Sequence, residues 1–232
     1  MNIDTELHRT LSAQIADVLA RAIIDGRHPP GARLNEVSLA SALGVSRSPL
    51  REALRMLETR GLVRITPQRG ARVTMLSQEE VLHLFEIRAV LVGLAARQVS
   101  LKMDSGLRQV LSTGIERLEQ ALNNPLAYAK ASAEVTLLLA HASGNPRLEE
   151  MIRSFADQIG RYARLGLASA DRRKRSIRNW RLAFAAMRAR DPERSEVFQR
   201  RLAEENRDAV LKALSSEGEQ PTTSQDARRR RA

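Results

Sequence analysis

Arginine and serine side chains recur at helical spacing over residues 47–55, where they could recognise DNA. Arg47, Arg51 and Arg55 lie four residues apart, so a helix presents them on one face, with Ser48 beside them. An arginine can donate hydrogen bonds to a guanine edge or pair with a phosphate, and a serine hydroxyl can bind either group. A solvated arginine face on a small helical domain would give the same pattern. The spacing therefore favours DNA binding over that alternative without excluding it.

Two short helices are predicted around a turn at Gly44, and an amphipathic helix over residues 7–25 precedes them. Asn35 and Ser46 can each cap a helix, because their side-chain oxygens accept a bond from an unpaired backbone N–H. Pro49 falls in the first turn of the second helix, where proline does little harm. The apolar stripes expected to face the core are Val37, Ala40 and Leu43 in the first helix, and Leu50, Ala53, Leu54 and Leu57 in the second. This helix-turn-helix would place its second helix in a DNA major groove.

After Gly61 the apolar period changes from that of a helix to that of a strand. Val63 and Ile65 alternate with polar residues, and a turn follows, which predicts a β-hairpin, or wing. Arg69 and Arg72 are expected at its tip, placed to reach a minor groove or phosphates. A surface hairpin with two solvated arginines is the alternative, which the preceding helix pair makes less favoured.

The chain therefore divides into two predicted domains and a tail. Residues 1–76 are expected to form a winged helix-turn-helix of three helices and a hairpin. Residues 77–214 read as helices throughout, opened by a capping box of Ser77 and Glu80. Residues 215–232 are polar, end in four arginines and are expected to be a disordered basic tail. The predicted fold class is mainly α, with short loops joining an antiparallel bundle.

Composition limits the classes of function. The 232 residues carry a formal net charge of +11, which suits a polyanionic partner, although the excess is spread over both predicted domains. The chain has no cysteine, which excludes disulfides, thiolate metal sites and cysteine nucleophiles. It shows no signal peptide and no apolar run of the ~18 residues that span a bilayer, so we expect a cytoplasmic protein without a membrane partner. No paired carboxylates, histidine cluster or phosphate loop supports an enzyme.

A family resemblance rests on an ordered set of N-terminal residues and a looser C-terminal set. The N-terminal set is Gly26, Pro30-Gly31, Leu34, Glu36, Leu39-Ala40, Leu43-Gly44-Val45-Ser46-Arg47-Ser48-Pro49, Arg51-Glu52-Ala53-Leu54, Leu57, Gly61-Leu62, Gly70 and Val73. The C-terminal set is Arg88, Ser143-Gly144-Asn145-Pro146, Ser176 and Asp191. With these residues the chain resembles the GntR family of bacterial transcription regulators, specifically the FadR subfamily with an FCD ligand-binding domain. The resemblance implies a six- or seven-helix bundle and a homodimer that reads a short palindromic operator in double-stranded DNA.

Carried over position by position, the resemblance implies which residues contact DNA. The contacts are expected mainly from α-helical Ser46, Arg47, Ser48 and Arg51, and Gly70 would let the wing approach the DNA backbone. The whole assigned interface is Glu36, Ser46, Arg47, Ser48, Pro49, Arg51, Arg69, Gly70 and Arg72. Val37 departs from members that have an arginine there, so the operator sequence of those members cannot be transferred.

The effector domain departs further from the family pattern. Most FCD domains bind a divalent metal through one aspartate and three histidines, and the resemblance places those positions at Ser132, Thr136, Trp180 and Leu202. None of these is a good metal ligand. His141 lies five residues beyond Thr136, about 140° round the helix, so it does not repair the site. We therefore expect no metal and no other cofactor; a metal held by some other cluster is the alternative.

The same comparison outlines an effector pocket, expected to comprise Arg88, Ser132, Thr136, Arg161, Trp180 and Leu202. Arg88 could bind an acidic effector in a bidentate manner, or form a structural salt bridge with Glu116 or Glu134. Trp180 could contact the ligand or fill the volume of the lost ion. The pocket would accept a small carboxylate or an acyl-type metabolite, whose binding changes the separation of the recognition helices and relieves repression. Alternatively the pocket is filled, and the domain only dimerises.

Overall fold

The computed structural model describes residues 10–218, of which the first part folds as three helices and a small sheet. The elements are α1 (Leu11–Ile24), β1 (Arg33–Leu34), α2 (Glu36–Leu43), α3 (Arg47–Thr59), β2 (Val63–Thr66) and β3 (Gly70–Val73). The predicted winged helix-turn-helix is confirmed. The sheet has a third strand, β1, which pairs antiparallel with β3 in the order β1-β3-β2. Two residues are too short to show alternation, so the sequence did not predict this strand.

The core of this part is aliphatic and is shared by α1, α2, α3 and the sheet. Leu50, Leu54 and Leu57 are at most 1% exposed, as their spacing predicted. The prediction for Val37 is wrong, because its side chain is 55% exposed. Leu39 packs on the core instead, since the buried arc of α2 is centred near Leu43, about 120° round the helix from Val37.

Two of the three predicted helix caps are present. Asn35 Oδ1 accepts hydrogen bonds from the backbone N–H groups of Val37 and Ser38, at 2.9 and 3.1 Å. Ser46 occupies the cap position of α3, but its side chain makes no capping hydrogen bond, so that prediction is wrong. The capping box at residues 77–80 is confirmed, with both of its reciprocal hydrogen bonds formed.

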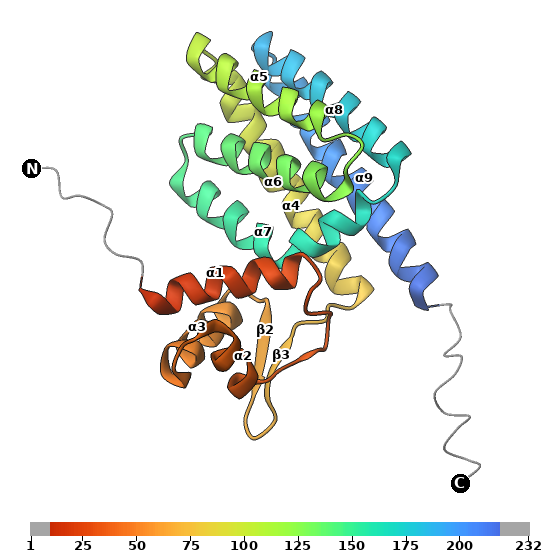
Figure 1. Cartoon of the computed structure of the whole chain (residues 1–232). Helices are drawn as coiled ribbons and strands as arrows, with labels where there is room; N and C mark the ends of the chain where they lie inside the picture. The colour runs from red at the N-terminus through yellow and green to blue at the C-terminus, as the bar shows by residue number, and fades with distance from the viewer. Residues whose placement is uncertain (1–9, 219–232) are drawn as a thin grey trace, which may run out of the picture.

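In the described residues six helices follow, and they form one bundle above the winged domain (Figure 1). They are α4 (Gln78–Leu101), α5 (Ser105–Gln120), α6 (Pro125–Ala142), α7 (Pro146–Gly166), α8 (Ala170–Arg188) and α9 (Pro192–Gly218). The predicted proline positions at the helix starts hold for α6, α7 and α9. Residues 215–218, which had been assigned to the tail, continue α9; the rest of the predicted disordered tail lies outside the described residues.

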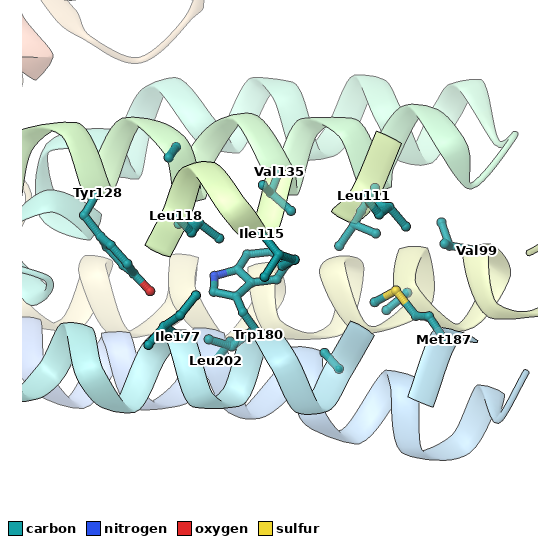
Figure 2. Packing of buried hydrophobic residues seen from close by; sticks show 14 of the residues in the cluster. Val99, Leu111, Ile115, Leu118, Tyr128, Val135, Ile177, Trp180, Met187 and Leu202 are labelled. Carbon is teal, nitrogen blue, oxygen red and sulfur yellow. The ribbon is translucent and has the colours of Figure 1, made fainter. Parts of the chain in front are cut away.

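The long helices α4 and α9 pack along each other, and α8 lies beside α9. The largest apolar cluster fills the bundle between α4, α5, α6, α8 and α9, and Trp180 lies in its middle, near Ile115 and Leu202 (Figure 2). Within the described range no helix is both long enough and apolar enough to cross a membrane. The bundle is therefore held by a largely aliphatic core that also buries the rings of Trp180 and Tyr128.

The two helix caps of the helix-turn-helix make a matched pair of stability tests. Asn35→Ala should lower the free energy of unfolding by about 1 kcal/mol, because two backbone N–H groups lose their acceptor. Ser46→Ala should change it by less than about 0.5 kcal/mol, because no capping bond is lost. Urea denaturation followed by circular dichroism measures both values. An equal loss for the two variants would contradict the difference between these caps.

Candidate nucleic-acid interface and buried cavity

The exposed face of α3 carries the side chains that the sequence assigned to DNA. Arg47, Ser48, Arg51 and Arg55 are all exposed, while Leu50, directly beneath them, is fully buried. The buried leucines fix the rotation of α3, and this rotation turns the arginines outward along one line. The arrangement can place guanidinium and hydroxyl groups against base edges or phosphates.

Glu36, which was assigned to the DNA interface, pairs with an arginine of α3. Its carboxylate Oε2 accepts a hydrogen bond from Arg51 Nε at 2.7 Å, which joins α2 to α3. The Arg51 side chain is 62% exposed, so this ion pair is screened by water and can be exchanged for a phosphate or a base. A carboxylate itself repels DNA phosphates. The geometry therefore suits Glu36 to positioning Arg51 rather than to contacting DNA.

The wing places only one of its two assigned arginines at the tip. Thr66 pairs with Gly70, so Arg69 lies in the turn between β2 and β3. Arg72 lies within β3, and its Nη1 donates to the carbonyl oxygen of Gly31 at 2.9 Å. The prediction that Arg72 lies at the tip is wrong, because the hairpin closes at Gly70 and the strand continues through residue 73.

The sheet also brings together arginines that the sequence analysis did not assign. Arg33 and Arg64 lie opposite Arg72 on either side of it, and all three are exposed. Like charges in adjacent positions of a sheet destabilise it slightly. The strand β1 that supplies Arg33 was too short to predict, so no sequence signal could have revealed this ladder.

A network centred on Arg60 ties the winged domain to the bundle. Arg60, at the C-terminal end of α3, donates from Nε to Asp157 Oδ2 at 2.7 Å and from Nη1 to Asp17 Oδ1 at 3.0 Å. Burial alone would lower the pKa of Arg60, but the hydrogen bonds and charges of the two carboxylates outweigh it and raise the pKa. Asp157 belongs to α7, so the end of the recognition helix is fixed directly to a bundle helix.

Three further contacts place α7 against the winged domain. Arg164 Nη1 donates to the carbonyl oxygen of Asp25 at 2.8 Å, and the backbone N–H of Leu76 donates to Tyr162 Oη at 3.0 Å. A Cβ added at Gly160 would lie 3.4 Å from the side chain of Ile24 in α1. These contacts dock α7 against the DNA-binding part.

The same helix borders a cavity of about 70 Å³ inside the bundle. Ile159, Gly160 and Ala163 contribute from α7. Five of the six residues assigned to an effector pocket line the same cavity, namely Arg88, Ser132, Thr136, Trp180 and Leu202. The family positions, which lie on four different helices, therefore converge on one space in the fold.

Arg161 is the exception and does not line this cavity. On α7 it is about 200° round the helix from Ile159, whose side chain borders the cavity. Arg161 instead lines a larger open cleft, of about 810 Å³, with Met75, Tyr162 and Leu214. The sequence pattern predicts that Arg161 lies in the bundle, but it does not determine which side of α7 is turned to the winged domain.

Two arginines line the cavity, and one of them has no ion-pair partner in the described residues. Arg88 makes no salt bridge with Glu116 or Glu134 in the described residues, and its guanidinium carbon lies 5.9 Å from the ring centre of Phe85. Burial lowers the pKa of Arg88 to about 10, so it stays charged at neutral pH. Arg172, which the sequence analysis missed, also lines the cavity and pairs with Glu205 at 3.5 Å. None of the described lining residues is an aspartate or glutamate.

The lining does not fit the divalent metal of most FCD domains. Ser132 and Thr136 stand at two of the ligand positions, and Thr136 Oγ1 already donates to the carbonyl oxygen of Ser132 at 2.8 Å. Between residues 10 and 218 no group of three or more histidine, cysteine, aspartate or glutamate side chains could hold a metal ion. The hydroxyl, indole and aliphatic groups at these positions are poor ligands for such an ion.

Two amide side chains of α9 complete the lining. Gln199 and Asn206, two turns apart on one face of the helix, are 2% and 5% exposed and border the cavity. Neither residue stands at a metal position of the family, so the resemblance did not assign them to the pocket. Their signal was present: amides alternating at helical spacing with Leu202 and Ala203 predict polar groups turned toward a core.

Comparison with known proteins accounts for both parts of the chain. Residues 11–73 match the model of bacterial regulatory proteins of the gntR family, and residues 83–213 match the FCD domain. An uncharacterized HTH-type transcriptional regulator of Bacillus subtilis (strain 168), YdhC, is 31% identical over 212 residues, which cover 89% of this chain and 93% of that protein. The HTH-type transcriptional regulator McbR of Escherichia coli (strain K12) is 27% identical over 210 residues, 84% of this chain and 93% of its own length.

The structural comparison agrees with the sequence matches. The solved structure of E. coli McbR/YncC superposes with a TM-score of 0.78 at 24% identity, covering 89% of this chain and 99% of that one. A structure of a putative transcriptional regulator GntR from Rhodococcus sp. RHA1 gives a TM-score of 0.74 at 22% identity, covering 88% and 98%. At these identities the likeness shows the shared fold.

The Arg60–Asp157 contact predicts a measurable coupling between the two parts of the chain. Arg60→Ala and Asp157→Ala should each lower the free energy of unfolding, and the double variant should lose less than the sum by on the order of 1 kcal/mol. Urea denaturation of the four proteins gives this coupling energy. Arg153→Ala, which removes an exposed pair with Glu149 on the same helix, is the control and should cost less than about 0.5 kcal/mol. Additive losses would show that the Arg60 contact does not hold the domains together.

Proposed function

The chain belongs to the GntR family of bacterial regulatory proteins and carries an FCD domain. We propose that it is a cytoplasmic repressor that responds to an effector and binds a palindromic operator as a homodimer. Like these relatives, it is a transcription regulator and not an enzyme. The observation that carries the proposal is the exposed row of Arg47, Ser48 and Arg51 on α3, above a fully buried leucine core. This row supplies the groups that read a major groove.

The DNA-binding face is proposed to combine α3 with the tip of the wing. Ser46, at the start of α3, has a hydroxyl that no capping bond occupies, so it is available to DNA. Pro49 is half-buried in the first turn and shapes this end of the helix. Arg69 and Gly70 lie at the wing tip, where glycine allows the backbone to approach a phosphate. Arg72, bound to Gly31, supports the wing from within the sheet.

Arg47→Ala and Arg51→Ala should each weaken binding to a specific duplex at least tenfold, because one good arginine–guanine contact contributes about 1–3 kcal/mol per half-site. The duplex is one selected by the wild-type protein from a random library, and fluorescence anisotropy at fixed salt gives the affinity. Arg178→Ala removes the same charge from the exposed face of α8 and should change the affinity little. Equal losses from all three variants would indicate nonspecific charge attraction and contradict operator reading.

The proposed homodimer rests on an exposed apolar stripe of α4. Ile87, Leu94 and Leu101 lie seven residues apart with Val90 between them, and their side chains are 37–56% exposed. The opposite face of α4 is buried against α9. A heptad-spaced apolar seam is what two copies of one helix bury against each other, and a two-fold axis uses the same patch twice. We therefore propose that α4 pairs with α4 of a second copy.

Val90→Glu should convert the protein to a monomer of 25.9 kDa, because a charge in a two-fold seam faces its own copy and is desolvated. Light scattering after size-exclusion chromatography measures the mass, and circular dichroism checks the helix content. Val110→Glu is the control: Val110 is 50% exposed, like Val90 at 51%, but lies on α5, away from the stripe. A wild-type monomer would contradict the proposed homodimer, and dissociation by Val110→Glu alone would place the interface elsewhere.

The effector is proposed to be a small anion bound in the bundle cavity without a metal. Arg88, which has no ion-pair partner in the described residues, supplies the positive charge, whereas that of Arg172 is balanced by Glu205. A single water needs roughly 10–15 Å³ of such space, so a cavity of about 70 Å³ holds a short acid and not a long acyl chain. This favours a carboxylate over the acyl-type ligand. Buried polar groups along the lining also argue against a domain that only dimerises.

The route from effector to DNA is proposed to run through α7. Gly160 borders the cavity and also faces Ile24 of the winged domain, so little more than backbone separates the two. Three residues earlier on the same helix, Asp157 holds Arg60 at the end of the recognition helix. A ligand that displaces α7 would move both recognition helices of a dimer. Effector and operator must then weaken each other by the same factor.

A further inference from the structure

Val37 is an exposed apolar residue beside the proposed DNA-binding face, and its side chain is 55% exposed. It lies in the first turn of α2, which Asn35 fixes by accepting hydrogen bonds from the backbone N–H groups of Val37 and Ser38. A single exposed valine is ordinary on a protein surface. Its neighbours therefore decide whether it has a role.

The residue before Val37 joins this turn to the recognition helix. Glu36 Oε2 accepts a hydrogen bond from Arg51 Nε at 2.7 Å, and Arg51 belongs to the exposed row of α3. The helix α2 packs against α3 and lies on the far side of α1 from the bundle (Figure 1). DNA bound to the row of α3 would therefore run past the first turn of α2, where Val37 is exposed.

The side chains around Val37 leave room for DNA to approach. Ser38 and Ser41 are exposed, and they lie about 100° and 40° round the helix from Val37. Both are small, and a serine hydroxyl can donate a hydrogen bond to a phosphate. The one carboxylate of α2, that of Glu36, is paired with Arg51. This side of α2 is therefore open to a close contact.

The chemistry of valine limits what such a contact can recognise. An isopropyl group forms no hydrogen bond, so it gives nothing in return for displacing water from a phosphate or a polar base edge. The major groove offers one apolar group among the edges of the four bases, the C5 methyl of thymine. Contact between the isopropyl group and this methyl removes both from water, which stabilises the complex.

We propose that Val37 selects thymine, by contacting the C5 methyl of one thymine in each half-site next to the bases that α3 contacts. This inference rests on the proposed function, because it needs a sequence-specific complex. It adds a residue that determines specificity and the base that this residue selects. A homodimer would meet this thymine twice, once in each half of a palindrome.

The test removes one methyl group at a time from the DNA. Each thymine of the duplex selected by the wild-type protein is replaced, in both half-sites, by deoxyuridine, which pairs in the same way but lacks the C5 methyl. At one position the replacement should weaken wild-type binding on the order of tenfold, because one buried methyl contributes roughly fourfold in each half-site. Fluorescence anisotropy at fixed salt measures the affinities.

Val37→Ala should lose a similar factor on the unmodified duplex and should be insensitive to the deoxyuridine at that position. This coupling distinguishes a direct contact from an effect of deoxyuridine on the shape of the DNA. Val18→Ala is the control, since it shortens a valine of α1 that is 40% exposed and should leave both affinities unchanged. Circular dichroism checks that both variants fold.

The outcomes separate this contact from the function on which it rests. A selected duplex in which no thymine methyl affects binding would overturn the role of Val37, as would a methyl effect that persists in Val37→Ala. Operator binding would still stand in both cases on the Arg47 and Arg51 variants. A wild-type protein that selects no duplex would contradict the proposed function, and the contact of Val37 with it.

Discussion

The structure depends on α7, which packs against the winged domain and borders the bundle cavity at the same time. Asp157, Arg164 and Tyr162 meet the winged domain, and Ile159 and Ala163 on the same helix close the cavity. A packed interior is stiff, so a helix shared by two sites transmits a displacement rather than absorbing it. The partly buried Arg60 pair is better suited to this role than a fully exposed ion pair, because it is less screened by salt.

The arginines of α3 and Arg88 in the bundle differ in their exposure to water. The arginines of α3 are exposed to water, so their charges carry no desolvation penalty. The rigid leucine core beneath them fixes their orientation. In the bundle, Arg88 is removed from water and finds only the ring of Phe85, which is a weak partner for a cation. The first site is ready to bind a polyanion at its surface. The second keeps an uncompensated charge that an anionic ligand would stabilise.

Local features of this fold could be predicted because local physics produces them. Helical periodicity located α3 and its buried leucines, and the cap at Asn35 and the box at Ser77 follow from interactions within three residues. Predictions failed where a distant element decided the outcome. Val37 is exposed because α2 turns its other side to the core, Arg72 is held by Gly31, and Arg161 faces away from the cavity. The family positions did converge on one cavity, but its amide lining on α9 was overlooked.

The sequence by itself determined the class of protein, the helix-turn-helix with its row of arginines, and the lack of metal-ligating side chains at the usual positions, since each depends only on residue type and spacing. Only the tertiary structure decided which face of α7 meets which neighbour, that Arg88 has no ion-pair partner in the described residues, and that Gln199 and Asn206 border the same space. The physical reason is that pairing and burial depend on contacts between residues far apart in the chain. Local periodicity determines which side of a helix is apolar, and not what that side will touch.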